Sequence, residues 1–258
     1  MSRVLVIGLQ EITHDLLLPW VRQGFLPNIA SLIDKGSVGR LHARAPLITP
    51  HGWANILTGV QAGRHGIFDY WQRDTDGVFR ESTSENLRVP AVWDHLHNTG
   101  LRCTFLNVPL TDPPPDLDGL VAAAAKSGSP SREHFSPRDT YDRLAAAGIA
   151  YRPEATAPGG RKKKDYIGLF DIETPKTAQA FEFLLESRPW DFALVYFVDA
   201  AMAQHYFWSD MLEGGNNPYC DVVLSAYRNL DAAIGRLADS AGPNTNIFLL
   251  SECGAGPI

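Results

Sequence analysis

The sequence predicts an α/β fold with a doubly wound, mainly parallel sheet. Short apolar runs, which are typical of buried strands, alternate along the chain with longer segments whose apolar residues recur at helical spacing. Strands that alternate with helices favour a parallel sheet with helices on both faces. The 258 residues, of which 45% are hydrophobic and 20% charged, are expected to form one large domain.

The composition excludes several classes of partner and location. A formal net charge of −6 argues against nucleic acid or an anionic membrane as the main partner. No apolar run approaches the roughly 18 residues of a membrane helix, and the run at residues 4–9 is too short for a signal peptide. Cys103, Cys220 and Cys253 are widely spaced, which favours reduced thiols. We therefore expect a cytoplasmic protein.

The first 60 residues contain the strand that opens the predicted sheet and the clearest helix start. Arg3–Leu9 is short and rich in apolar, β-branched residues, as a buried strand should be. Thr49 precedes Pro50 and an apolar run at helical spacing. Threonine is a good N-cap and proline suits the first helical turn, so Thr49 is predicted at a helix N-terminus. Further elements are expected as helices at residues 12–24 and 26–36 and as a short strand at residues 37–43.

The rest of the chain continues the alternation around one irregular segment. Residues 112–170 are rich in proline, glycine and charge, and we expect them to form a cap-like insertion over the sheet. Outside this segment the patterns predict helices at residues 90–100, 174–188 and 223–242, and strands at residues 102–108, 191–198 and 245–251.

Four polar residues are predicted to meet at one edge of the sheet. Ligands of open α/β sheets bind beyond the carboxyl ends of the strands. Gln10, Asp199 and Glu252 each follow a predicted strand, and Thr49 begins a helix that comes after the first strand. The sequence therefore predicts a functional site at this edge.

Thr49 suits the chemistry of an oxyanion. The N-terminus of a helix offers free backbone N–H groups and the positive end of the helix dipole, which together favour phosphate or sulfate. A threonine hydroxyl that attacks phosphorus must lose its proton, and two metal ions about 4 Å apart can achieve this. Such metals need carboxylate and imidazole ligands. The alternative is that Thr49 simply caps its helix.

Five parts of the sequence, in order, resemble the type I phosphodiesterase/nucleotide pyrophosphatase branch of the alkaline phosphatase superfamily. They are VLVIGLQE, PLITPHGWANILTG with GRHGIFDYW, VWDHLHNTGLRCTFLNVPLTDPPPDLDG, WDFALVYFVDAAMAQHYFW, and YRNLDAAIGRLADSAGPNTNIFLLSECGAGP. The first of these occupies the place of a family strand that normally ends in Gly-Leu-Asp-Gly. The resemblance implies an alkaline-phosphatase-like sheet, hydrolysis of phosphodiesters or pyrophosphates with two metal ions, and Thr49 as the nucleophile.

The positions that the resemblance assigns to metal ligands are mostly substituted. His205 matches the histidine of an Asp-x-x-x-His pair, but Ala201 stands in place of the aspartate. Gln10 replaces the family's first aspartate. Glu252 and Cys253 replace the Asp-His pair of a Ser-Asp-His-Gly signature, and a last histidine would lie beyond the final residue. We therefore expect no two-metal site.

Two rebuilt one-metal sites are compatible with the sequence. One holds a single zinc ion, with ligands from Glu252, Cys253, Thr49 and, as a weak fourth contact, Gln10. A thiolate ligand favours zinc over magnesium or manganese. The other joins Asp199 to His205 through a bulge at the end of the strand. Without a metal, His205 is a packing or hydrogen-bonded histidine and Cys253 a small apolar filler.

Three functions are compatible with these patterns. The first is a degenerate phosphodiesterase homologue that binds a phosphate- or sulfate-bearing small molecule, or a protein, with Thr49, Gln10 and His51 as candidate ligand-binding residues. The second is an active hydrolase or transferase with one zinc ion and Thr49 as its nucleophile. The third is a metal-free enzyme that uses a Cys253 thiolate beside His205. Because the sequence ends soon after its last predicted strand, we also expect either a homo-oligomer that covers the exposed part of the sheet or a truncated sequence.

Overall fold

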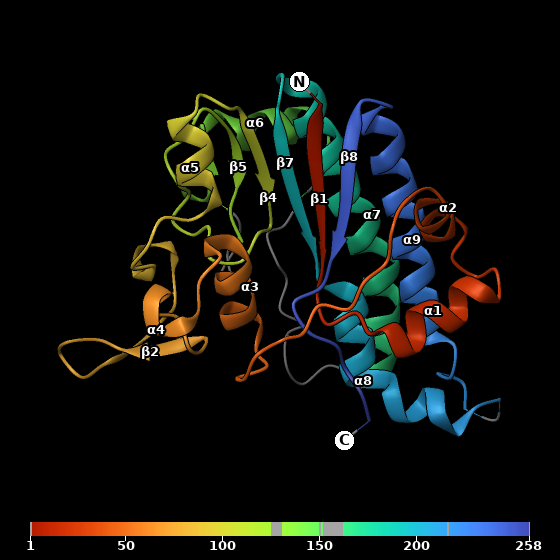
Figure 1. Ribbon diagram of the computed structural model, residues 1–258. Helices are drawn as coiled ribbons and strands as arrows, with labels where there is room; N and C mark the ends of the chain where they lie inside the picture. The colour runs from red at the N-terminus through yellow and green to blue at the C-terminus, as the bar shows by residue number, and fades with distance from the viewer. Residues whose placement is uncertain (1, 125–130, 150, 152–161, 216, 258) are drawn as a thin grey trace.

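The chain forms a six-stranded sheet with helices on both faces, which confirms the predicted α/β, mainly parallel architecture (Figure 1). The computed structural model describes residues 2–124, 131–149, 151, 162–215 and 217–257. The strand order is β6-β5-β4-β7-β1-β8; β6 runs antiparallel to β5, and the other neighbouring strands are parallel. The strands are β1 Arg3–Leu9, β4 Cys103–Leu106, β5 Gly119–Ala122, β6 Phe135–Ser136, β7 Phe192–Phe197 and β8 Thr245–Leu250.

Helices cover both faces of the sheet. Successive side chains of β1 point to opposite faces, so this strand packs against both layers of helices. Leu5 and Ile7 are fully buried in the larger core, to which α7 and α9 contribute. On the other face, Gly8 lies against Trp53 of α3. The helices are α1 His14–Arg22, α2 Pro27–Lys35, α3 Thr49–Thr58, α4 Ala62–His65, α5 Val92–Asn98, α6 Asp139–Ala146, α7 Lys163–Ser187, α8 Asp199–Glu213 and α9 Val222–Ala241, with short 3-10 turns at Ser84–Asn86 and Arg132–His134.

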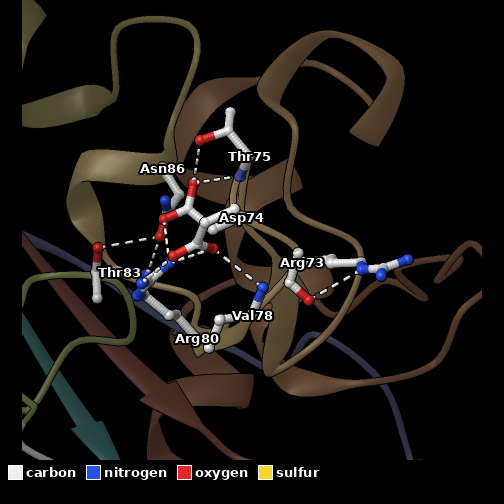
Figure 2. A network of polar contacts seen from close by, with 9 residues as sticks. Arg73, Asp74, Thr75, Val78, Arg80, Thr83 and Asn86 are labelled. Carbon is white, nitrogen blue, oxygen red and sulfur yellow. Dashed lines mark hydrogen bonds and ion pairs between the residues drawn. The ribbon is translucent and has the colours of Figure 1, made fainter.

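A separate hairpin projects beside α4. It consists of β2 (Trp71–Arg73) and β3 (Phe79–Glu81). The guanidinium group of Arg80 bonds the carboxylates of Asp74 and Asp76 across the turn, at 2.5 and 2.6 Å (Figure 2). Because this network is about half exposed to solvent, we attribute to it the shape of the turn rather than much stability.

The structure differs from the sequence-based expectation in two segments. Residues 37–43 form no strand; they are an exposed loop without a strand partner among the described residues. Part of the range 112–170 belongs to the sheet and not to a cap. The buried run Gly119–Ala122 pairs with β4 as β5, and α7 begins at Lys163. A strand of four residues gives too weak a pattern to stand out in a proline-rich segment. A cap formed by the remaining residues stays a prediction.

The longest helix that was not predicted is α8. α8 begins at Asp199, directly after β7, and runs to Glu213. Across the described residues, no helix combines the length and the apolar character needed to cross a membrane.

Candidate functional site

The candidate site lies at the carboxyl ends of β1 and β8, beside the first turn of α3. Gln10 directly follows β1, Glu252 lies two residues after β8, and Thr49 is the first residue of α3. Gln10 Nε2 donates a hydrogen bond to Thr49 Oγ1 at 3.2 Å. All three side chains are buried, with exposed fractions of 5%, 3% and 5% for Gln10, Glu252 and Thr49. The structure thus brings together three residues that the strand-end argument predicted. The N-cap of α3, however, is Ile48 and not Thr49.

Two glycines allow this close approach. A Cβ atom on Gly52 would lie 2.8 Å from Cβ and 2.9 Å from Cγ of Glu252, which is closer than real Cβ atoms come to other carbon atoms. A Cβ atom on Gly8 would lie 2.5 Å from the Trp53 ring. The glycine after Pro50-His51 therefore lets the Glu252 segment lie directly against α3, and the glycine in β1 lets α3 lie directly against the sheet.

The Glu252 carboxyl group is buried with few compensating contacts. Its Oε1 accepts a hydrogen bond from the Tyr196 hydroxyl at 3.2 Å. The Thr49 hydroxyl also interacts with the carboxyl group, but Oε2 has no partner with full hydrogen-bond geometry in the described part of the chain. Burial raises the pKa of Glu252 to about 7, and the nearby charge of Glu11 acts in the same direction. The group therefore gains or loses its proton near neutral pH.

Glu11 is a site residue that the sequence reasoning missed. Its backbone has a φ of 51°, in the left-handed region that favours glycine. Its carboxylate contacts Gln10 Nε2 at 3.4 Å and bonds His205 Nε2 on α8. This contact raises the pKa of His205, whose side chain is about half exposed. The available signal was a glutamate directly after Gln10, where the motif that the sequence resembles has glycine.

Asp199 and His205 bond to different partners. Both belong to α8, six positions from each other, and β7 ends before them without the bulge that the sequence reasoning required. Asp199 accepts a hydrogen bond from Thr174 on α7 at 2.6 Å, whereas His205 bonds Glu11. Ala201, between them in sequence, is fully buried.

The His51 ring lies against the loop after α4. Its Nδ1 lies 3.3 Å from the carbonyl oxygen of Ile67, and its ring centroid lies 5.9 Å from that of His65. Its Nε2 is buried without a partner among the described residues. Burial lowers the pKa of His65, and His51 adds to this effect. A ligand-binding role for His51 stays a prediction.

Comparison with known proteins identifies the family. The family model described as type I phosphodiesterase / nucleotide pyrophosphatase matches residues 4–258. The chain belongs to this family. The resemblance stated from the sequence motifs, including membership of the alkaline phosphatase superfamily, is thereby confirmed.

Two solved structures share the phosphodiesterase-family fold of this chain. Both are phosphonoacetate hydrolase from Sinorhizobium meliloti 1021, one in complex with phosphonoformate (TM-score 0.67) and one with phosphonoacetate (TM-score 0.60). Each is 16% identical to this chain, and the match covers 98% of this chain and 57% of the hydrolase. The chain thus spans little more than half the length of these structures. No curated protein matches it significantly.

Cys253, at the position of a family histidine, is a protonated thiol. Burial raises its pKa to about 12, and the charges of Glu252 and Glu11 contribute in the same direction. Because the thiolate is the nucleophilic form of cysteine, this environment opposes a role of Cys253 as a nucleophile. Within the described ranges, no group of three or more His, Cys, Asp or Glu side chains has an arrangement that would hold a metal ion.

A cavity of about 310 Å³ lies beside α3. The loop before α3, the exposed side of α3 and the segment after β8 form its wall. Its lining includes Leu41, His42, Arg44, Leu47, Ile56 and Val60, and it reaches Gly52, Glu252 and Cys253. Thr49 itself does not line it.

Proposed function

We propose that this chain is a degenerate member of the phosphodiesterase family that binds a phosphate- or sulfate-bearing small molecule and lacks two-metal phosphoester hydrolysis. One observation carries the proposal. The neutral amide of Gln10 donates a hydrogen bond to Thr49 Oγ1 at 3.2 Å. The resemblance implies a metal-binding carboxylate at the position of Gln10, beside this hydroxyl group. An amide N–H group holds the hydroxyl oxygen in place but does not carry the charge that would remove its proton.

The residues at the remaining ligand positions do not fit a pair of divalent metals. Divalent ions of this kind are held by carboxylates, imidazoles or thiolates. Ala201 offers no donor atom, His205 is bonded to Glu11, and Cys253 places soft sulfur where the family has a histidine. Glu252 alone retains an acidic ligand of the expected type, and its second oxygen has no partner among the described residues.

Anion binding is supported by the start of α3. The helix begins at Thr49 with Ile48 as its N-cap, so no side chain caps its first N–H groups. The positive end of the helix dipole attracts phosphate or sulfate. Arg44, on the wall of the neighbouring cavity, adds a formal positive charge. The Glu252 carboxyl group opposes anion binding only when it is ionised, and its pKa lies at about 7.

The test combines turnover with binding. Tag-free protein, purified without chelators, is supplied with zinc, manganese or magnesium and assayed with bis(4-nitrophenyl) phosphate; binding of inorganic phosphate and sulfate is measured by calorimetry. We expect no turnover above that of buffer, and saturable anion binding that survives Thr49→Ala. Turnover that EDTA abolishes, and that falls by orders of magnitude in Thr49→Ala, would show an active metal-dependent enzyme instead.

The two enzymatic alternatives have distinct outcomes in the same experiment. About one tightly bound zinc per chain, lost in Cys253→Ala, would support the one-zinc site. Activity that persists in EDTA but disappears in Cys253→Ser would support a thiol enzyme. A cytoplasmic location is a further proposal, supported by three free cysteines among the described residues. A homo-oligomer stays a prediction.

A further inference from the structure

We propose that the cavity beside α3 binds a small phosphate or sulfate monoester, with the alkyl or aryl group against its apolar wall and the oxyanion paired with Arg44. This inference rests on the proposed function and names its ligand class. It assigns the binding site to the loop of residues 41–48 together with α3, and not to the Thr49 hydroxyl, which is buried and does not line the cavity.

Part of the apolar wall of the cavity is exposed to solvent in the described chain. Leu41 and Leu47 line the cavity and remain 58% and 63% exposed. Ile56 and Val60 line the wall formed by α3 and the segment after it. Exposed leucines gain free energy when a ligand removes them from water, by about 25 cal/mol for each Å² of apolar surface. The wall therefore favours a ligand that carries an apolar group over a bare inorganic ion.

The charge of the cavity wall favours an anion. Arg44 has neither a hydrogen-bond nor an ion-pair partner within the part of the chain that the structure describes, so its guanidinium group is available to a ligand. His42 also lines this wall, and a ring N–H group there can donate a hydrogen bond to an oxyanion. A guanidinium group can bond two oxygens of a phosphate or sulfate at once, which a single ammonium group does not match.

The size of the cavity limits the ligand to a compact molecule. About 310 Å³ lies at the lower end of the roughly 300–1,000 Å³ that small-molecule sites occupy. The apolar wall can take one organic group and the guanidinium group can take one oxyanion, as in an ester with a single organic substituent. An aryl monoester such as phenyl phosphate meets these requirements and serves as the probe.

The experiment measures dissociation constants by calorimetry for phenyl phosphate, inorganic phosphate and phenol. We expect phenyl phosphate to bind at least about tenfold more tightly than either of the others. Inorganic phosphate lacks the apolar group, and phenol lacks the oxyanion. Arg44→Met should weaken phenyl phosphate about tenfold, and Arg22→Met, a change of an exposed arginine on α1, should have no effect. Leu47→Ser should weaken phenyl phosphate about fourfold but leave inorganic phosphate unchanged. The matched control is Leu212→Ser, since Leu212 is 65% exposed and lies outside the cavity.

Each contrary outcome has a separate meaning. Equal affinity for phenyl phosphate and inorganic phosphate would overturn the monoester inference and leave the proposed function intact. Equal affinity for phenyl phosphate and phenol, or full affinity in Arg44→Met, would overturn the role of Arg44. No binding of any oxyanion would overturn the inference and the anion-binding function together. A dimer in sedimentation that Leu47→Ser dissociates would assign the cavity wall to a second copy of the chain.

Discussion

At the scale of single residues, the site is defined by where its negative charges lie. The carboxylate expected after β1 is absent at Gln10, but Glu11 supplies one from the next position, with its backbone at a φ of 51°. Left-handed backbone costs a residue with a Cβ atom roughly 1–2 kcal/mol. The structure therefore holds Glu11 against this cost, through the bond of its carboxylate to His205 and the hydrogen bond that its carbonyl oxygen accepts from Gln204.

This cost predicts an ordering of variants at position 11. Glu11→Ala and Glu11→Gly both remove the contact with His205, but only glycine relieves the backbone. We expect Glu11→Gly to be more stable than Glu11→Ala by about 1 kcal/mol in urea denaturation. Equal stabilities would mean that the backbone at position 11 relaxes when its side chain is removed.

The buried carboxyl group of Glu252 predicts a dependence of stability on pH. Its pKa is raised from 4.5 to about 7 in the folded chain, so the folded state binds this proton more tightly than the unfolded state does. The contribution of Glu252 should therefore be greatest below pH 4.5, fall as the pH rises to 7 and stay constant above, a total loss of about 3 kcal/mol. Glu252→Gln should remove this fall.

Chemical denaturation from pH 4.5 to 8 measures the effect as the difference between wild type and variant. Glu133→Gln, which neutralises an exposed carboxyl group, is the control and should leave the slope unchanged. A slope that Glu252→Gln does not alter would show that Glu252 is ionised throughout this range.

At the scale of secondary-structure elements, the site depends on contact between α3 and the segment after β8. Gly52 is the contact point, because a Cβ atom there would overlap the side chain of Glu252. We expect Gly52→Ala to destabilise the chain by about 1–3 kcal/mol through overpacking, despite the better helix propensity of alanine.

Gly168→Ala provides the matched control for Gly52→Ala. Gly168 lies in α7, and no atom lies within 4 Å of the Cβ that alanine would add, so this change should be neutral or stabilise by up to about 1 kcal/mol. Urea denaturation of both variants decides the matter. If Gly52→Ala is as stable as wild type, the segment after β8 moves freely relative to α3.

At the scale of the whole molecule, the elements that the sequence predicted are those with strong local patterns. β1, β7 and β8 are strands of six or seven residues that are mostly apolar, and α9 has a clear helical period. β5 was missed because its four residues become a strand through pairing with β4, a contact between distant parts of the chain. α8 was missed because much of its surface is buried, so its first turns show no polar face.

The candidate site also has features that the sequence predicts and features that it does not. That Gln10, Thr49 and Glu252 lie close together could be predicted from the rule that ligands bind at strand ends. This prediction required only the positions of the strands. The place of Glu11 depends on a single left-handed backbone angle, and the separation of Asp199 from His205 depends on the start of α8. Neither feature has a signature in local sequence. The cavity beside α3 likewise depends on the path of an irregular loop.

The response of the whole molecule to metal ions is the last prediction. A ligand that binds only the folded state stabilises it by RT ln(1 + [L]/Kd), which is about 2.7 kcal/mol at a hundred times Kd. For a domain of this size, that gain raises the melting temperature by roughly 5–10 °C. Because the proposed function includes no metal site, we expect EDTA, zinc and manganese each to shift the melting temperature of the wild type by less than about 1 °C.

Two variants make this thermal measurement decisive. Zinc at high concentration can bind a free thiol, so the melting curves are repeated with Cys253→Ser, which should behave as the wild type does. A zinc-dependent rise of several degrees that Cys253→Ser abolishes would instead support the one-zinc site. A rise with manganese that Glu252→Gln abolishes would show that the carboxyl group still holds a metal, against the proposed loss of metal-dependent chemistry. A melting temperature unaffected in every arm means that the folded chain gains no stability from these ions, as the proposed loss of the metal sites predicts.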